Sequence, residues 1–324
     1  MRRAADPADD HRGPDARMSP VRLPFAGTIK EGLLATGWYA NRLEPERFPG
    51  VLTLCYHGLR RSDAAASSVP NANLHVTDTK FDAHCRVLAG MCHPIDLATF
   101  DEARRDGRPL PDRPVLITFD DGYRSVFEIA RPILRRYRIP AAVFVCSEPV
   151  ERQRLFWFDA VMRVLGADAV GCLRALPREG WRDLAAAHET PAAAAPELAP
   201  MTESQVRQLA DEGFTIGAHT ATHAPLADAP GEVQHRELAS CRDALEAWTR
   251  QRVEAVAYPF GEPHADYTAE TVAIAERLGF TAGFTTRHDY ARPSEPPLER
   301  SRFVMLDAIG AGELAHRIAH TWPR

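Results

Sequence analysis

The feature that most constrains this chain is a series of short, unbroken apolar runs that recur between helical segments. Their hydrophobicity is continuous and not alternating, which is typical of strands covered on both faces and therefore of a parallel sheet. Because helical patterns separate the runs, the order of elements predicts an α/β fold, either a barrel or an open sheet. The runs lie at 51–58, 115–122, 141–148, 214–220, 255–261 and 281–286.

Two of the segments between these runs indicate where helices begin and bend. Thr202, with Gln205 three residues later, forms the pattern of a capping box, and Gly213 marks the end of that helix. The segment after Gly122 also has helical spacing, but we expect Pro132 to kink it or to start a second piece.

The ends of the chain and one internal segment do not follow the repeat. Residues 1–25 are polar and rich in Pro, Asp and Arg, which predicts a disordered tail. Residues 26–46 predict an amphipathic helix that caps the domain, with docking to a membrane surface or to a partner as the alternative. We expect a barrel-like domain at 47–310 and a C-terminal helix at 311–324. The domain would contain a partly helical insertion at about 150–200, for which a flap over the site is one role.

Composition and charge narrow the classes of function. The formal net charge of -5 and the absence of a dense Lys/Arg tract argue against a nucleic-acid-binding surface. No stretch approaches the length that spans a membrane, and the N-terminus lacks the apolar core of a secretory signal, so we expect a cytoplasmic protein. The six cysteines form no C-x-x-C pair and several lie in apolar runs, which favours reduced, buried thiols.

Polar side chains gather where the apolar runs end. The first run ends in His57, the second in Asp120 and Asp121, and the fourth in His219, with His223 four residues later. Function in parallel α/β folds gathers at the C-terminal ends of the strands. We therefore expect these side chains to meet at one rim of the sheet.

Their chemistry suits a metal ion. With one carboxylate, His219 and His223 form a ligand set for Zn²⁺ or a similar divalent ion. Two adjacent carboxylates cost free energy unless a cation or a shared proton relieves the repulsion. One Asp would bind the ion, and the other would take a proton from water whose pKa Zn²⁺ lowers to roughly 7.

Neither motif is specific by itself. Asp before Gly often only shapes a turn, and a second H-x-x-x-H pair occurs at His316 and His320 in an amphipathic C-terminal segment. A receiver-like phosphoacceptor site at Asp120 and Asp121 would leave His219 and His223 without a role. The prediction of a metal site is stronger because both motifs stand at strand ends of one α/β chain.

Three stretches in this order, "TFDDGY", "IGAHTATH" and "AYPFG", resemble the signatures of the polysaccharide deacetylases, the NodB-homology group of carbohydrate esterase family 4. The resemblance covers about residues 50–305. It implies a distorted (β/α) barrel of the polysaccharide deacetylase type, which removes N- or O-acetyl groups from sugars with a divalent metal.

The resemblance also implies roles for individual residues. Asp120 matches the general base, and Asp121, His219 and His223 match the metal ligands. The backbone amide of Phe260 matches the oxyanion-binding group. Zn²⁺ is the expected metal, and Co²⁺, Ni²⁺ or Mn²⁺ would fit the same ligands.

The acid that protonates the leaving amine has two candidates. Most of the family uses a His in a late Leu-x-His motif, which His316 fits by letter but not by its helical context. A subset begins with a strand that ends in Tyr-His, as "LTLCYHGL" does, so we favour His57. For the late arginine that holds the base we prefer Arg302 to Arg300, because Arg302 directly precedes the apolar pair Phe303-Val304.

The sequence predicts the substrate only as a class. We expect a saccharide with an N-acetylhexosamine unit, nucleotide-linked or lipid-linked if the protein is cytoplasmic, in contact with Tyr123, Tyr258 and Trp157. The alternatives are an amide or cyclic-imide hydrolase on the same fold and a catalytically inactive member that binds carbohydrate. Nucleic acid is not an expected partner, whereas peripheral membrane contact stays open.

Overall fold

A curved parallel sheet forms the centre of the protein in a computed structural model that describes residues 26–42, 48–166, 169 and 178–320. The order of its strands is β10-β1-β5-β6-β7-β8-β9, with β4 also paired to β5 and every pairing parallel. The bounds are β1 Leu52–Tyr56, β4 His93–Pro94, β5 Pro114–Phe119, β6 Ala141–Val145, β7 Thr215–Ala218, β8 Ala255–Ala257, β9 Ala282–Phe284 and β10 Phe303–Val304. A separate parallel pair consists of β2, Leu59–Arg60, and β3, Val76–Thr77.

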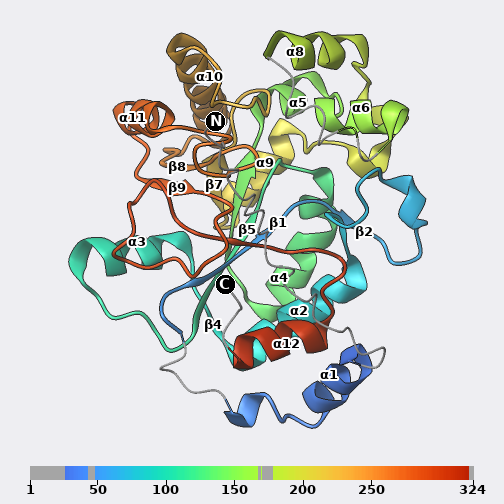
Figure 1. Cartoon of the computed structure of the whole chain (residues 1–324), viewed down its shortest axis with the longest axis vertical. Helices are drawn as coiled ribbons and strands as arrows, with labels where there is room; N and C mark the ends of the chain where they lie inside the picture. The colour runs from blue at the N-terminus through green and yellow to red at the C-terminus, as the bar shows by residue number, and fades with distance from the viewer. Residues whose placement is uncertain (1–25, 43–47, 167–168, 170–177, 321–324) are drawn as a thin grey trace, which may run out of the picture.

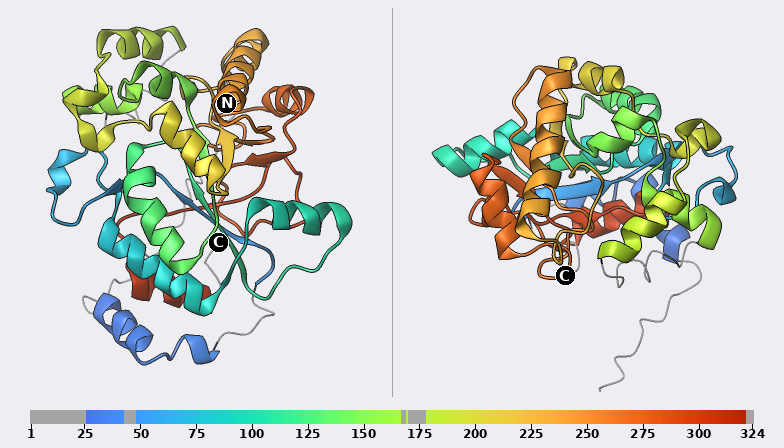
Figure 2. Two further views of the ribbon diagram at one scale, coloured as in Figure 1. Left: turned by 180° about the vertical axis from the view of Figure 1, so that it is seen from behind. Right: turned by 90° about the horizontal axis from the view of Figure 1, so that it is seen from above.

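One short segment joins the two edges of the sheet. Arg300 forms a parallel bridge with Phe284 of β9, and three residues later Phe303 of β10 pairs with Leu54 of β1. The segment therefore closes the sheet into a distorted barrel with helices around it (Figures 1 and 2). This confirms the predicted barrel of the polysaccharide deacetylase type.

Burial on both faces explains the continuous apolar runs. In β5, Ile117 and Phe119 belong to the larger core, which lies between the strands and the helices. Leu116 belongs instead to a smaller core inside the barrel, together with Phe144 and Phe284. Because successive side chains point to opposite faces, every residue of such a strand is apolar or must find a buried partner.

The helices follow the predicted signals. Thr202 and Gln205 make both hydrogen bonds of a capping box at the start of α9. Before Pro132 the chain forms a π-helical turn, Val126–Ala130, and α4 begins at Arg131, so the proline starts a second piece as expected. The helices around the barrel are α2 Asp78–Met91, α3 Leu97–Asp106, α4 Arg131–Tyr137, α9 Glu203–Asp211, α10 Gly231–Thr249 and α11 Ala269–Arg277. Short 3₁₀ segments lie at Ala66–Ser68, Ala192–Ala194 and Pro196–Leu198.

The two end helices pack on each other, away from the insertion. Helix α1, Ala26–Ala35, contacts α12, Ala311–Ala319, and both lie at the bottom of Figure 1. Leu33 and Leu34 pack against the core, whereas Ile29 is 57% exposed. A 3₁₀ turn follows at Ala40–Arg42, and the predicted tail at 1–25 lies outside the described residues.

The insertion is partly helical and covers the opposite end of the molecule. It contains α5 Ser147–Arg152, α6 Trp157–Leu165 and α8 Arg178–Ala187, which lie together at the top of Figure 1 and of the left view of Figure 2.

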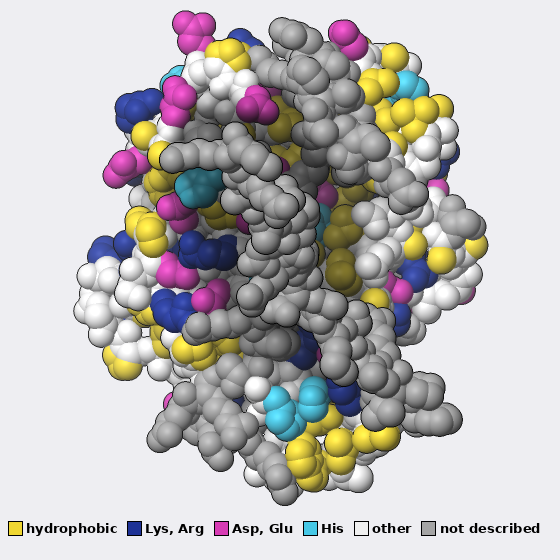
Figure 3. All heavy atoms as spheres, in the orientation of Figure 1, with side chains coloured by type: hydrophobic (Ala, Val, Ile, Leu, Met, Phe, Trp, Pro, Cys, Tyr) yellow, Lys and Arg dark blue, Asp and Glu magenta, His cyan; other side chains and the backbone are white. Residues whose placement is uncertain are grey.

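Acidic and basic side chains are interspersed on the visible left part of the face in Figure 3. None of the described helices has both the length and the apolar character needed to cross a bilayer.

Candidate metal centre and catalytic site

The predicted site residues follow directly on the ends of neighbouring strands. His57 follows β1, Asp120 and Asp121 follow β5, and His219 follows β7. Backbone hydrogen bonds tie these ends together, since the amide of Asp120 donates to Tyr56 at 2.9 Å and the amide of His219 donates to Val145 at 3.1 Å. The barrel thus brings residues from distant parts of the sequence to one rim.

The backbone at this rim is strained. Asp121, His223 and Phe260 adopt left-handed conformations with φ of 71°, 58° and 61°. Non-glycine residues rarely adopt this region, and such residues concentrate at functional sites. Gly122 has φ of 96°, and a Cβ there would lie 2.9 Å from Val145 Cγ1, so the turn after the two aspartates requires glycine.

Asp121, His219 and His223 form a compact cluster of ligand atoms. The Nε2 atoms of His219 and His223 lie 3.5 and 3.4 Å from Asp121 Oδ1, and all three side chains are buried. Tetrahedral ligands at about 2.0–2.1 Å from Zn²⁺ lie about 3.3–3.4 Å from one another. The spacing therefore fits three ligands around one ion.

Hydrogen bonding in the cluster supports the same conclusion. His219 Nδ1 lies 2.8 Å from the carbonyl oxygen of Ala257, which accepts its proton when the ring is neutral and leaves the Nε2 lone pair directed at Asp121. Asp121 Oδ1 has no hydrogen-bond partner among the described residues. Burial lowers the pKa of His223 to about 3, so this ring is also neutral and can bind a cation. Burial opposes protonation of His219, but the Asp120 and Asp121 carboxylates outweigh it and raise its pKa, so the cluster favours an added positive charge.

Asp120 has a different environment from its neighbour. Arg302 donates through Nη1 and Nη2 to the two oxygens of Asp120, each at 2.7 Å, and Cys55 Sγ lies 3.3 Å from Oδ2. Burial alone would raise the pKa of Asp120, but the Arg302 guanidinium and His219 hold it well below its usual range. Arg300 is not part of this contact, because it pairs with Asp101.

His57 lies beside Asp120 and is not part of the cluster formed by Asp121 and the two other histidines. One ring nitrogen of His57, Cys55 Sγ and an Asp120 oxygen all lie within 4.8 Å of one another. The His57 side chain is partly exposed, and its Nδ1 is buried without a hydrogen-bond partner among the residues described. The His57 ring therefore lies next to Asp120, the predicted base, and has one buried nitrogen without a hydrogen-bond partner among the described residues.

A second histidine at the rim, His75, escaped the sequence analysis. It is buried against Gly58, where a Cβ would lie only 2.2 Å from its Nδ1, and its ring centroid lies 4.9 Å from that of Tyr123. Burial and the neighbouring His57 lower the pKa of His75 to about 4, so it is neutral near pH 7. No strand ends at His75, and it is not part of a metal-type spacing, so the sequence held no signal for it.

The insertion also contributes a buried acid that the sequence analysis missed. Asp159 accepts a hydrogen bond from the hydroxyl of Tyr123 at 2.6 Å, and burial raises its pKa to about 8. Two neighbours in α6 touch a metal-ligand candidate, since Trp157 Nε1 donates to the carbonyl of His223 at 3.3 Å and the Phe158 ring lies 4.7 Å from the His223 ring. The insertion thus forms a wall of the site, and "FWFD" in the sequence was the available signal.

Two predicted substrate contacts and one candidate acid have surroundings that argue against those roles. Tyr258 is fully buried and stacks on Tyr267 at 4.3 Å, so its position argues against contact with a substrate. Tyr123 is 2% exposed and directed at Asp159, which argues against direct contact as well. His316 lies in α12 with its Nδ1 3.3 Å from the Tyr39 hydroxyl, as its helical context suggested.

Fold and site together define a class. This is a (β/α)-barrel protein whose strand ends carry a His/His/Asp ligand set beside a carboxylate held by arginine. The chain belongs to the polysaccharide deacetylase family, whose model matches residues 107–283.

The sequence identity between this chain and individual relatives is low. The chain is 23% identical to YxkH of Bacillus subtilis over 247 residues, which are 75% of this chain and 66% of that protein. It is 28% identical to the poly-beta-1,6-N-acetyl-D-glucosamine N-deacetylase of Staphylococcus aureus over 35% of this chain and 41% of the relative. Among solved structures, the Streptococcus pyogenes deacetylase PplD in complex with acetate matches with a TM-score of 0.62 and 22% identity, over 83% of this chain and 98% of PplD. The chain thus spans about two thirds of YxkH and less than half of the Staphylococcus aureus deacetylase.

Proposed function

We propose that this protein is a metal-dependent hydrolase that removes the N-acetyl group from a hexosamine unit of a saccharide. The observation that carries the proposal is the difference between two adjacent carboxylates. Arg302 holds Asp120 through both oxygens at 2.7 Å, whereas Asp121 faces two imidazole nitrogens at 3.4 and 3.5 Å. This difference supports Asp120 as a fixed, ionised base and Asp121 as a ligand of a cation.

Asp121, His219 and His223 would hold the metal. When bound, a divalent ion such as Zn²⁺ lowers the pKa of water to roughly 7 and polarises the acetyl carbonyl. Co²⁺, Ni²⁺ or Mn²⁺ would suit the same His/His/Asp set. The buried Asp121 Oδ1 without a hydrogen-bond partner supports this assignment.

Asp120 is the proposed general base. Its carboxylate has about four lone pairs, and the described contacts with Arg302 and Cys55 use three of them, which leaves one on Oδ1. This lone pair takes the proton of the attacking water. Because Arg302 fixes the carboxylate through two hydrogen bonds, the base does not have to reorient during the reaction.

Phe260 and His57 complete the proposed mechanism. The backbone amide of Phe260 donates to the oxygen that becomes negative when water adds to the acetyl carbon. His57, next to Asp120 and partly exposed, gives a proton to the leaving amine nitrogen as the C–N bond breaks. The products are acetate and an amino sugar.

The proposed substrate class is an N-acetylhexosamine unit within a glycan or a glycan precursor. The name of the Staphylococcus aureus relative states a poly-beta-1,6-N-acetyl-D-glucosamine substrate, which supports a saccharide here. Trp157, half-buried beside His223, offers an aromatic surface for a sugar ring.

Acetate release from free, nucleotide-linked, lipid-linked and oligomeric N-acetylhexosamines tests this function. The purified protein is assayed with and without a chelator, beside Asp120→Asn. Release that requires both the metal and Asp120 supports the proposal. Release that survives the chelator contradicts the metal role. If the metal is bound and no substrate releases acetate, sugar deacetylation is ruled out and a ring-opening assay on cyclic imides follows.

A further inference from the structure

The two histidines of the candidate metal centre are oriented in different ways. His219 Nδ1 lies 2.8 Å from the carbonyl oxygen of Ala257, which fixes its ring. The Nδ1 atom of His223 is buried and has no hydrogen-bond partner among the described residues. Histidines that bind a metal are usually oriented through a hydrogen bond at their second ring nitrogen. The orientation of His223 therefore depends on its backbone and on packing.

The backbone at His223 needs support from its surroundings. His223 and Thr220 have φ of 58° and 64°, in the left-handed region. Non-glycine residues keep such a conformation only where the neighbouring structure enforces it. The rings of Phe158 and Phe260, with centroids 4.7 and 4.9 Å from that of His223, restrain the imidazole but not the backbone. Other contacts must therefore hold the loop itself.

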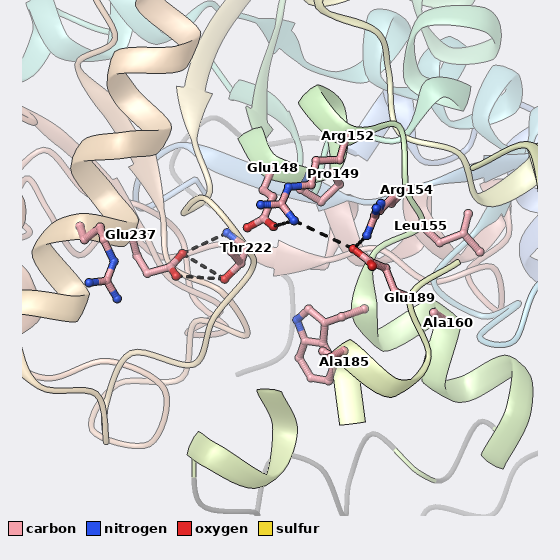
Figure 4. A pocket seen from close by; sticks show the side chains of 13 residues that line it. Glu148, Pro149, Arg152, Arg154, Leu155, Ala160, Ala185, Glu189, Thr222 and Glu237 are labelled. Carbon is pink, nitrogen blue, oxygen red and sulfur yellow. Dashed lines mark hydrogen bonds and ion pairs between the residues drawn. The ribbon is translucent and has the colours of Figure 1, made fainter. Parts of the chain in front are cut away.

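One side of this loop borders a cavity of about 560 Å³. Thr222, which directly precedes His223, lines the cavity together with Glu148 and Glu237 (Figure 4). Atoms that line a cavity have fewer packing partners than atoms in a filled core. On this side, the loop therefore depends on hydrogen bonds more than on packing.

Glu237 of α10 supplies these hydrogen bonds. Its carboxylate accepts from the amide of Thr222 at 3.0 Å and from the Thr222 hydroxyl at 3.1 Å, as Figure 4 shows. Its backbone carbonyl also accepts from the amide of Ala221 at 3.0 Å. Glu237 is only 7% exposed, so water competes little for these bonds. Glu237 thus fixes the two residues that lead into His223.

We propose that Glu237 is a positioning residue for the metal centre. It holds the loop so that Nε2 of His223 stays directed at Asp121, whose Oδ1 lies 3.4 Å away. The inference rests on one part of the proposed function, the binding of a metal by Asp121, His219 and His223. It adds a residue from outside the three stretches that carry the family resemblance.

Four variants separate positioning from charge. Glu237→Gln keeps the size of the side chain but loses the negative charge and one acceptor oxygen. Glu148→Gln is the matched control, because Glu148 lines the same cavity and its side chain pairs with Arg152 at 3.1 Å. Thr222→Val replaces the hydroxyl that donates to Glu237 by a methyl group, whereas Thr222→Ser keeps that hydroxyl.

The first measurement is the dissociation constant for Zn²⁺, obtained by competition with a chromophoric chelator and without substrate. We expect Glu237→Gln to bind Zn²⁺ about 10- to 100-fold more weakly than the unmodified protein. Thr222→Val should lose about fivefold, as for one hydrogen bond, and Thr222→Ser and Glu148→Gln should stay within about twofold. Equal losses in Glu237→Gln and Glu148→Gln would trace the effect to charge and overturn the proposal. Unchanged affinity in Glu237→Gln would overturn it as well.

The second measurement shows whether a loss of affinity comes from the geometry of the site. Each protein is saturated with Co²⁺, whose visible absorption depends on the number and arrangement of its ligands. We expect an altered spectrum in Glu237→Gln and the spectrum of the unmodified protein in Glu148→Gln. An unaltered spectrum in Glu237→Gln would mean that His223 keeps its place without Glu237, which contradicts the proposal.

Thermal unfolding of the metal-free proteins is the control for folding. If Glu237→Gln does not fold, the two variants of Thr222 decide. Weaker Zn²⁺ binding by Thr222→Val than by Thr222→Ser supports the positioning role, and equal binding by the two overturns it.

These measurements do not depend on turnover. The expected affinities in a protein that releases no acetate from any sugar would support the role of Glu237 and contradict the proposed function. Metal-dependent acetate release, with the same Zn²⁺ affinity in every variant, would support the function and overturn the positioning role. An unmodified protein that binds no metal would contradict both.

Discussion

Two pairs of histidines with the same spacing lie in two different environments of this molecule. His219 and His223 stand in a loop at the strand ends and face the carboxylate of Asp121 at 3.5 and 3.4 Å. His316 and His320 stand at the C-terminal end of α12, with their ring centroids 4.3 Å apart. An H-x-x-x-H spacing allows two imidazoles to meet, but only the fold decides whether an anion joins them.

The second pair lies among aromatic side chains, with Lys30, Glu313 and Arg317 as its charged neighbours. His320 stacks on Trp38 at 5.9 Å, and His316 contacts the Tyr39 hydroxyl. These contacts dock the N-terminal segment against α12. We therefore propose that the first pair serves chemistry and the second serves packing, and the predictions on His223, His57 and Tyr39 below test that division.

The largest effect is expected for the loss of a metal ligand. His223→Ala should lose the bound metal and reduce acetate release at least about 10³-fold, because water is no longer activated. His320→Ala, the matched change in the other pair, should retain metal and remain within about twofold in activity. Metal content and kcat/KM of both variants are measured, with thermal unfolding as the control for folding. Metal loss in His320→Ala would break the comparison.

The next effect concerns the proton donor. His57→Gln should lower kcat about 10²-fold, within the usual range for loss of general acid catalysis, whereas His316→Gln should leave kcat unchanged. Substrates with a more acidic leaving amine need less protonation, so they should recover activity in His57→Gln. The reverse pattern, with His316→Gln impaired and His57→Gln intact, would assign the acid to α12.

Much of this division could be predicted from the sequence. The apolar runs predicted the strands, because the residues of a strand covered on both faces are apolar throughout. The polar residues that directly follow these runs predicted the rim. Two strands of the main sheet, at His93–Pro94 and Phe303–Val304, have only two residues each and are too short to leave a periodic pattern. Arg302 could be preferred to Arg300 only from its position before the second of these.

The sequence analysis missed two buried residues from outside the strand repeat. His75 and Asp159 reach the rim through a loop and through the insertion, and nothing local fixes which way such segments pack. Tyr258 follows β8 directly, as the functional residues do, yet its side chain is directed at Tyr267 in the core. Position after a strand thus predicts the rim for the backbone but not the direction of every side chain.

A third prediction uses the burial of Asp159 beside the rim. Burial raises the pKa of Asp159 to about 8, against about 3.9 in an unfolded chain. Between these values the folded protein holds a proton that the unfolded chain has released, so rising pH lowers the free energy of unfolding by up to about 1.4 kcal/mol per pH unit.

Asp159→Asn should remove this dependence while it still accepts the hydrogen bond from Tyr123. The metal-free variant should therefore be more stable than the metal-free parent at pH 8, with a difference that shrinks towards pH 4. Chemical denaturation of both proteins across this range, after treatment with a chelator, measures the difference. A difference that does not vary with pH would mean that Asp159 is ionised in the folded protein.

The smallest effect is expected at the docked end helices. Tyr39→Phe removes the hydroxyl that lies 3.3 Å from His316 Nδ1 and keeps the ring that packs edge-on against the same histidine at 5.7 Å. The loss of one such hydrogen bond should cost about 0.5–1.5 kcal/mol of stability, because water replaces it only in the unfolded chain. Metal content and kcat/KM should not change, since no rim residue contacts this pair among the described contacts. Denaturation and acetate release, measured on the same preparation, decide the matter: a variant that keeps its stability but loses activity would show that α12 acts on the rim and that the two histidine pairs are not independent.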